Sequence, residues 1–443
     1  MNRMHVIRFA VLAAVAVLIT SRPGAAIDVQ RIDTPGGLKA WLVEDHTNPI
    51  ISLRFAFRGA AGLDPAGKEG LANLAASTMD EGAGDLDSQA FQQTLEDRAI
   101  RIRFEAGMDN FGGRLQTLVR DRDAAFRLLR LALTAPRFDT EPVERVRAQI
   151  LVGLKQEEED PHAIAGKAMR EVLYGGHPYG RPSDGTAASV KSINRDDLLG
   201  FVGRRLARDN MAIGVVGDVT PDALAALLDA TFGALPPKAA AWKLPDHKAM
   251  TDGRTVVIKK DVPQSAIVFA DQGLKRADPD FYAAYVMNHI LGGGGFTSRL
   301  YGEIREKRGL AYSVGTGLNP RDASATMGGG AGTANARVKE TLDVLKTEWR
   351  RMSESGATAK ELTDAKTYLT GAYPLRFSAS GRIARMLVGI QLADLGIDYV
   401  KNRNGFIEAV TGQDIARVAK KLLDPKRLVT VVVGRPEGVT STP

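Results

Sequence analysis

The chain has 443 residues, of which 44% are hydrophobic and 25% are charged, and it contains no cysteine. This length exceeds what one hydrophobic core organises, and the composition is that of a folded protein, which excludes a disulfide-stabilised miniprotein and a disordered chain. Lysine and arginine alternate with aspartate and glutamate and form no dense basic segment, so nucleic-acid binding has little support.

The first 26 residues have the pattern of a secretory signal peptide. A basic start precedes an apolar run at residues 9–19, and small residues then allow cleavage after Ala26. The apolar run is too short to span a bilayer, and no other stretch is long and apolar enough to do so. Because the segment holds three arginines and no acidic residue, its removal lowers the formal net charge from +7 to +4. We expect a periplasmic protein, with a retained N-terminal anchor as the alternative.

Residues 27–234 form the first predicted half, which mixes strands and helices. Two strands with alternating hydrophobicity and β-branched residues are predicted at residues 37–46 and 49–60. Apolar residues at helical spacing predict the helices that follow, at residues 69–82, 86–98, 122–136 and 140–160. The half closes with a helix, a strand and a helix, at residues 195–206, 210–219 and 220–233.

Residues 254–443 form the second predicted half, which repeats this plan. Strands are predicted at residues 254–260 and 264–273, and helices at residues 278–292, 338–356 and 358–373. Its closing helix and strand, at residues 412–425 and 427–434, match the closing unit of the first half and indicate a duplication with a period of about 200 residues. Residues 235–253, rich in Pro, Ala and Lys, are the predicted linker. Without strict βαβ alternation, each half is predicted to be α+β.

The predicted helix at residues 69–82 has the spacing of a zinc-binding helix without the ligands. An H-x-x-E-H helix holds zinc with two histidines one turn apart and places a glutamate between them. Here those positions hold Asn73, Ala76 and Ser77. The segment GLANLAAS and its surroundings resemble the pitrilysin-type (inverzincin) metallopeptidase family, whose helix reads G-L-A-H-x-x-E-H. The resemblance places Gly153, in VGLKQEEEDP, where the family has its third ligand, a glutamate.

The resemblance therefore implies a subunit that does not bind zinc, because four positions that matter to the metal have changed together. The other histidines show no pair at ligand spacing. We interpret each of them as a surface or structural residue: His46, His162, His177, His247 and His289.

The resemblance covers nearly the whole chain after the signal peptide, and its most specific part is residues 291–314, LGGGGFTSRLYGEIREKRGLAYSV. Residues 177–193 and 210–219 also match the family's first half. Family members carry an arginine and a tyrosine in the 291–314 segment, and both are present here as Arg305 and Tyr312. From spacing alone, the pair reads as a surface salt bridge and a half-buried strand tyrosine, but the match of the whole segment favours a functional role.

Other nucleophile and phosphate motifs are missing from the sequence. No G-x-S-x-G elbow appears, and without cysteine a thiol nucleophile is excluded. The glycine-rich residues 291–296 and 327–333 lack the endings of a P-loop and the spacing of a dinucleotide fingerprint. We interpret both segments as turns beside an extended substrate.

The resemblance implies two homologous α+β halves, each a mostly antiparallel sheet flanked by helices, that form a clamshell with a partner. In two-chain members such as mitochondrial processing peptidase, a zinc chain pairs with a non-zinc chain around a central chamber. Arg305 and Tyr312 would then hold an unfolded peptide and stabilise the oxyanion in the active site of a partner with an intact H-x-x-E-H helix. This chain would need no cofactor, and zinc is expected in the partner. The alternative is an inactive peptide-binding or scaffold protein of the cell envelope.

Overall fold

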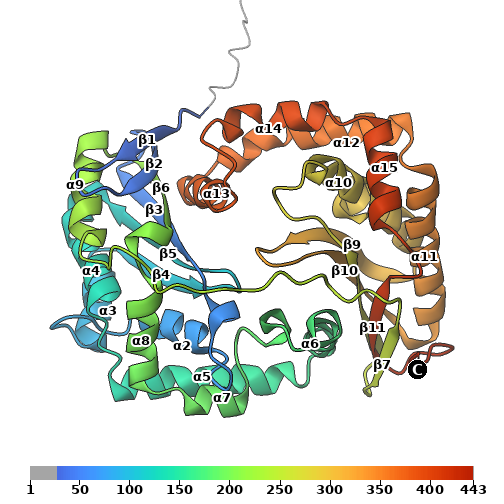
Figure 1. Cartoon of the computed structure of the whole chain (residues 1–443), viewed down its shortest axis with the longest axis horizontal. Helices are drawn as coiled ribbons and strands as arrows, with labels where there is room; N and C mark the ends of the chain where they lie inside the picture. The colour runs from blue at the N-terminus through green and yellow to red at the C-terminus, as the bar shows by residue number, and fades with distance from the viewer. Residues whose placement is uncertain (1–26, 443) are drawn as a thin grey trace, which may run out of the picture.

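Two β-sheets, each built by one half of the sequence, organise the computed structural model, which describes residues 27–442 (Figure 1). The first sheet has the order β1-β2-β6-β3-β5-β4, and its strands in chain order are Gln30–Asp33, Lys39–Glu44, Ile50–Arg58, Arg101–Ala106, Asn110–Leu118 and Met211–Gly217. The second has the order β7-β11-β8-β10-β9, and its strands are Thr255–Lys259, Gln264–Gln272, Ala311–Pro320, Ala325–Ala334 and Val429–Gly434. The predicted signal peptide at residues 1–26 lies outside the described residues.

The two sheets share one topology. Each has a single parallel pair, β2 with β6 and β7 with β11, and the remaining pairs are antiparallel. Apart from the extra strand β1, the second sheet repeats the strand order of the first. The predicted α+β class with two similar halves is therefore confirmed.

Helices flank both sheets. In the first half they are α2 Leu71–Thr78, α3 Ser88–Asp97, α4 Arg122–Thr134, α5 Thr140–Glu157, α6 Pro161–Tyr174, α7 Ala187–Ser192, α8 Arg195–Arg205 and α9 Pro221–Phe232. In the second they are α10 Phe281–Asn288, α11 Val338–Ser355, α12 Ala359–Gly371, α13 Ser380–Leu392, α14 Tyr399–Glu408 and α15 Gly412–Leu422, with π-helical segments at His289–Gly293 and Tyr301–Glu306. Among the helices of residues 27–442, none combines the length and apolar character needed to cross a bilayer.

One predicted turn is a strand in the structure. Residues 327–333 belong to β10, which pairs with β8 on one side and β9 on the other. The interpretation as a turn was wrong because these glycines serve close packing within the sheet. A Cβ on Gly329 would lie 1.9 Å from the carbonyl oxygen of Gly315, so only glycine fits there. Residues 291–296 do form helical turns outside the sheets.

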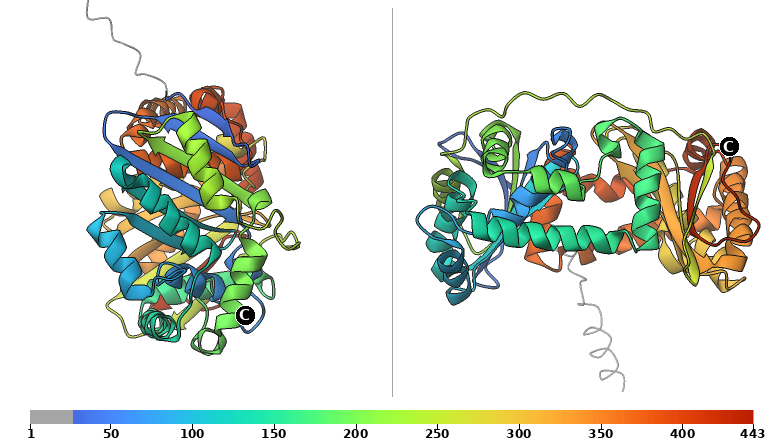
Figure 2. Two further views of the ribbon diagram at one scale, coloured as in Figure 1. Left: turned by 90° about the vertical axis from the view of Figure 1, so that its left-hand side faces the viewer. Right: turned by 90° about the horizontal axis from the view of Figure 1, so that it is seen from below.

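Helices α6 and α13 each cover the sheet of the opposite half. Helix α6 packs on β8 and β11, where Met169 and Leu173 join Val429, Val431 and Val433 in one apolar cluster. Helix α13 packs on β3 and β6. Figure 2 (right) shows the long helix α5 leading across to α6. The sheets therefore follow the two sequence halves, whereas their helical covers are exchanged, and the predicted domain boundaries stay a prediction.

The segment at residues 235–253 crosses between the halves without regular secondary structure (Figure 1). It is held by two stacked histidines, since the rings of His177 and His247 lie 4.9 Å apart. The Nε2 atom of His177 lies 2.9 Å from the Pro245 carbonyl oxygen, and its Nδ1 accepts the Tyr179 amide hydrogen at 3.2 Å. This arrangement requires a neutral ring with the proton on Nε2.

A first prediction concerns the close approach of α13 to β6. A Cβ on Gly214 would lie 2.7 Å from the Ala384 carbonyl oxygen and 2.9 Å from the Leu387 Cβ. Gly214→Ala should therefore lower the free energy of unfolding by about 1–3 kcal/mol, measured by urea titration. The matched control is Gly203→Ala in α8, where the new methyl group would meet no atom within 4 Å. Because alanine favours a helix more than glycine does, the stability of this variant should stay the same or rise. Equal stability of the two variants would contradict this packing.

A second prediction concerns pH. Burial lowers the pKa of His177 below its ordinary value, and His247 and Arg181 lower it further. The unfolded chain therefore binds a proton at this site more readily than the folded chain, so the free energy of unfolding should fall as the pH drops through about 6.5. Asn at position 177 keeps a side-chain acceptor for the Tyr179 amide and does not titrate. Urea titrations should show that the free energy of unfolding changes less between neutral and acidic pH in His177→Asn than in the wild type.

Candidate functional site

Helix α2, which carries three of the four degenerate metal-site positions, is anchored by a buried carboxylate. Asp64 is 5% exposed and accepts the backbone N–H groups of Gly70 at 3.0 Å and Ala72 at 3.2 Å. These are unpaired donors of the first helical turn, so Asp64 fixes where α2 begins. Burial raises the pKa of Asp64 to about 7, against the opposing effect of these hydrogen bonds.

The structure brings α2 and α5 together around a cavity of about 480 Å³. Ala76 and Ser77 line it from α2, and Gln149 and Ile150 line it from α5. Asn73 lies one turn earlier on α2 and is half-buried. Gly153 lies one turn beyond Gln149, and a Cβ placed there would meet no atom within 4 Å. Two of the four positions therefore line this cavity, and the other two lie one turn away along the same two helices.

The acidic side chains beside this cavity are neutralised by arginines. Asp80 is 7% exposed and accepts a hydrogen bond from Arg103 at 2.8 Å, and Glu81 pairs with Arg145 at 2.7 Å. Within residues 27–442, no group of three or more His, Cys, Asp or Glu side chains is placed to hold a metal ion. The side chains at the four positions do not fit zinc, because an amide, a methyl, a hydroxyl and a hydrogen are not its usual ligands, and the neighbouring carboxylates are engaged.

The structure places Arg305 and Tyr312 side by side in the second half. Arg305 lies in the π-helical segment Tyr301–Glu306, and Tyr312 is the second residue of β9. The guanidinium carbon of Arg305 is 4.6 Å from the centroid of the Tyr312 ring and 4.9 Å from that of Tyr301. Its Nη1 also donates a hydrogen bond to the Tyr301 hydroxyl. A cation held over a ring face orients both groups.

Two aromatic residues that the sequence analysis did not single out complete this group. Phe296 packs edge-on against Tyr301, with ring centroids 4.8 Å apart, and is 72% exposed. Tyr312 is 80% exposed. We call Phe296, Tyr301, Arg305 and Tyr312 the Arg305 cluster. Phe296 directly follows the glycine run of the 291–314 segment, and this position in the sequence could have marked it as a candidate site residue.

The degenerate metal-site positions and the Arg305 cluster are built by different halves of the chain. The cavity between α2 and α5 is lined by residues of the first half, whereas Arg305 contacts Tyr301 and Tyr312 of the second half. Large exposed aromatic side chains that are held in place offer a contact surface for another molecule. The arrangement offers an exposed phenol and a guanidinium as hydrogen-bond donors.

A third prediction concerns metal binding. The isolated protein should carry no stoichiometric zinc by elemental analysis. Restoring Asn73→His, Ala76→Glu, Ser77→His and Gly153→Glu should create measurable zinc affinity by calorimetry, because the helical spacing is kept and position 153 has room. The variant without Gly153→Glu is the control and should bind more weakly. Tightly bound zinc in the wild type would contradict this interpretation. No zinc binding by a folded quadruple variant would show that the orienting side chains have also diverged.

Comparisons with known proteins agree with these observations. The family model described as Peptidase M16 inactive domain matches residues 192–369. The non-peptidase homolog YmxG of Helicobacter pylori is 30% identical over 334 residues, covering 75% of this chain and 77% of that protein. An uncharacterized zinc protease of Mycobacterium leprae is 27% identical over 430 residues, covering 92% of each chain. The crystal structure of a peptidase M16 inactive domain from Pseudomonas fluorescens superimposes with a TM-score of 0.85 at 28% identity, covering 94% of this chain and 100% of that one. The chain therefore belongs to the pitrilysin-like peptidase M16 family, and its relatives include inactive, non-peptidase members of that family.

Proposed function

We propose that this chain is the non-zinc subunit of a heterodimeric M16 peptidase in the periplasm, and that its Arg305 cluster completes the active site of a zinc-bearing partner. The partner would carry the intact H-x-x-E-H helix and the zinc. The signal-peptide pattern at residues 1–26 supports the location. The substrates would be unfolded peptides held between the two subunits.

The observation that carries the proposal is the state of Tyr312. A tyrosine that is 80% exposed gains nothing from the core, yet Arg305 holds its ring at 4.6 Å and is itself held by Tyr301. Holding a solvent-facing side chain costs conformational entropy without burying apolar area. An intermolecular role explains why such an arrangement is kept, because the ring and guanidinium are then oriented before the partner or peptide arrives.

The two side chains suit different parts of peptide hydrolysis. The carbonyl oxygen gains negative charge as the tetrahedral intermediate forms, and a phenol placed beside it stabilises the transition state more than the ground state. A guanidinium donates several hydrogen bonds in a fixed plane and can hold a peptide carbonyl throughout the reaction. Neither role requires these residues to lie on the chain that holds the metal.

The comparisons support pairing of this kind, because proteins similar to this chain carry both kinds of name. One is named a non-peptidase homolog, and others are named zinc proteases. The competing proposal is an inactive peptide-binding or scaffold protein of the cell envelope, which needs no oxyanion donor.

A fourth prediction separates these two functions. In a complex with a zinc-bearing partner, Tyr312→Phe removes one hydroxyl and should lower kcat by about 10²–10³-fold, as for other oxyanion donors. The matched control is Tyr368→Phe, which changes another tyrosine that is 61% exposed, on α12, and should leave kcat unchanged. The measurement is steady-state cleavage of a quenched fluorescent peptide at equal zinc occupancy.

Arg305→Ala tests the other half of the pair. This variant should raise KM as well as lower kcat, because the guanidinium would hold the substrate in the ground state too. Assembly with the partner and the zinc content of the complex should survive both substitutions. Unchanged turnover of an intact complex containing Tyr312→Phe would contradict the shared active site and favour the scaffold function.

A further inference from the structure

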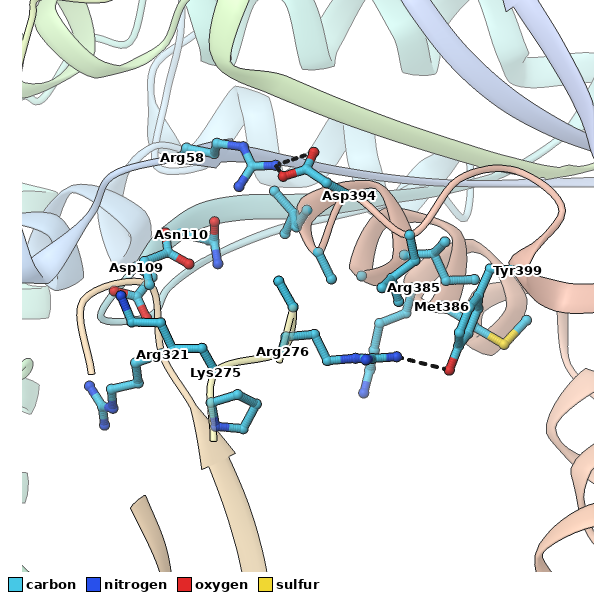
Figure 3. Close-up of a pocket in the computed structure, with 18 of the residues that line it drawn as sticks. Arg58, Asp109, Asn110, Lys275, Arg276, Arg321, Arg385, Met386, Asp394 and Tyr399 are labelled. Carbon is cyan, nitrogen blue, oxygen red and sulfur yellow. Dashed lines mark hydrogen bonds and ion pairs between the residues drawn. The ribbon is translucent and has the colours of Figure 1, made fainter. Parts of the chain in front are cut away.

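A second feature of the molecule is a cavity of about 910 Å³ between the two halves (Figure 3). It lies where the end of β3, the β4–β5 and β9–β10 turns, the loop after β8 and helix α13 converge. We call it the arginine-lined cavity. Its charged lining residues are Arg58, Asp109, Lys275, Arg276, Arg321, Asp322, Arg376, Arg382, Arg385 and Asp394.

Positive charge dominates this lining, with seven cationic side chains against three aspartates. Arg58 is paired with Asp394 at 3.0 Å, and Lys275 with Asp246 at 2.5 Å. For the other five cations, the described part of the chain offers no carboxylate within 4.0 Å. The five cations without a carboxylate within 4.0 Å repel one another, and a walled cavity concentrates their field. An anionic ligand would relieve this repulsion.

Two of these guanidiniums are held in place by aromatic rings rather than by acids. Arg276 lies 4.2 Å from the Phe281 ring centroid and donates hydrogen bonds to the hydroxyls of Tyr282 at 3.0 Å and Tyr399 at 3.2 Å. Figure 3 shows it extending across the cavity toward Tyr399. Arg321 lies 5.0 Å from the Tyr179 ring, and its Nε and Nη1 are buried without a protein acceptor. Guanidiniums fixed in this way retain their charge for a ligand.

Helix α13 supplies a further pair of cations. Arg382 and Arg385 are exposed and lie three residues apart, so they project from neighbouring positions of one helix face. The opposite face of the helix, with Ile383, Ala384 and Leu387, is buried against the first sheet. The packing of α13 therefore leaves its two arginines on the cavity side.

The cavity wall also has an apolar part that a small inorganic anion would not use. Pro320, Met386, Ile390, Leu392 and Leu395 line it beside the arginines. A cavity of this size accommodates an extended ligand that presents both carboxylates and apolar groups. A peptide with acidic and aliphatic side chains has this chemistry, and arginine pairs with carboxylates through two parallel hydrogen bonds.

We infer that the arginine-lined cavity binds an acidic peptide segment, whose carboxylates pair with Arg276, Arg382 and Arg385 and whose apolar side chains lie against α13. This inference names the peptide class for the proposed function and rests on that function only in taking a peptide as the ligand. Binding to the chain alone tests it without the zinc-bearing partner.

The experiment measures fluorescence anisotropy of a labelled peptide of alternating glutamate and leucine, titrated with the isolated chain at low ionic strength. Binding should weaken steeply as salt is added, because the contacts are charge pairs near solvent. The Arg382→Glu/Arg385→Glu variant should weaken binding by about tenfold or more. The matched control is Arg350→Glu/Lys420→Glu, which changes the net charge equally on the exposed surfaces of α11 and α15, and it should bind as the wild type does. Thermal melts of both variants report whether they fold.

Equal weakening by the two double variants would overturn the inference, since only net charge would then matter. Equal binding of a peptide with glutamine in place of glutamate would also overturn it. So would binding of tripolyphosphate at this cavity with no binding of the acidic peptide, because the ligand would then be a small polyanion. The two proposals fail separately. If Tyr312→Phe leaves kcat unchanged while the acidic peptide binds the isolated chain, only the proposal of a shared active site is rejected. If Tyr312→Phe lowers kcat while the acidic peptide does not bind, only the proposed peptide class is rejected.

Discussion

The rest of the structure depends on an exchange of helices, in which each half lends one helix to the sheet of the other half. Strand β11 is buried at every residue, and β6 is buried at nearly every residue, so both sheets need apolar cover on both faces. Each half supplies cover for one face of its own sheet, and the other face is covered by α6 or α13 from the opposite half. Burying a Val or Leu side chain contributes about 1.5–3 kcal/mol, so these two interfaces hold the halves at a set separation. The separation in turn defines the space between them.

Helix α13 links this packing to the chemistry of the space. Its apolar face is docked on β6, where Gln391 also donates a hydrogen bond to the Ile213 carbonyl oxygen at 2.8 Å. The helix cannot turn without losing that packing, so Arg382 and Arg385 stay directed to the cavity. The packing of α13 that covers one face of the first sheet therefore also positions Arg382 and Arg385. A stability constraint and the proposed binding surface therefore meet on one short helix.

Helix α2, which carries Asn73, Ala76 and Ser77, is held in place by core contacts rather than by a metal. Asp64 still caps α2, and α2 still packs on α5, because these contacts serve the core as much as they would serve a metal. The carboxylate of Asp80, which lies beside these positions, is paired with Arg103 and is not free to bind a metal. The Arg305 cluster, in contrast, adds little to the core through Phe296 and Tyr312, which are mostly exposed. The proposed function therefore uses side chains of the second half.

The sequence by itself determined the α+β class and the repeated plan, because hydrophobic periodicity is a local property. It also placed Arg305 and Tyr312 in one segment. Only the tertiary structure decided that α6 and α13 exchange sheets, that residues 327–333 form a strand, and that His177 stacks on His247. Each of these depends on contacts between residues far apart in the chain, which no local pattern encodes. The arginine-lined cavity arises in the same way, since Arg58, Arg276 and Arg385 are separated by more than a hundred residues each and meet only when the exchanged helix is in place.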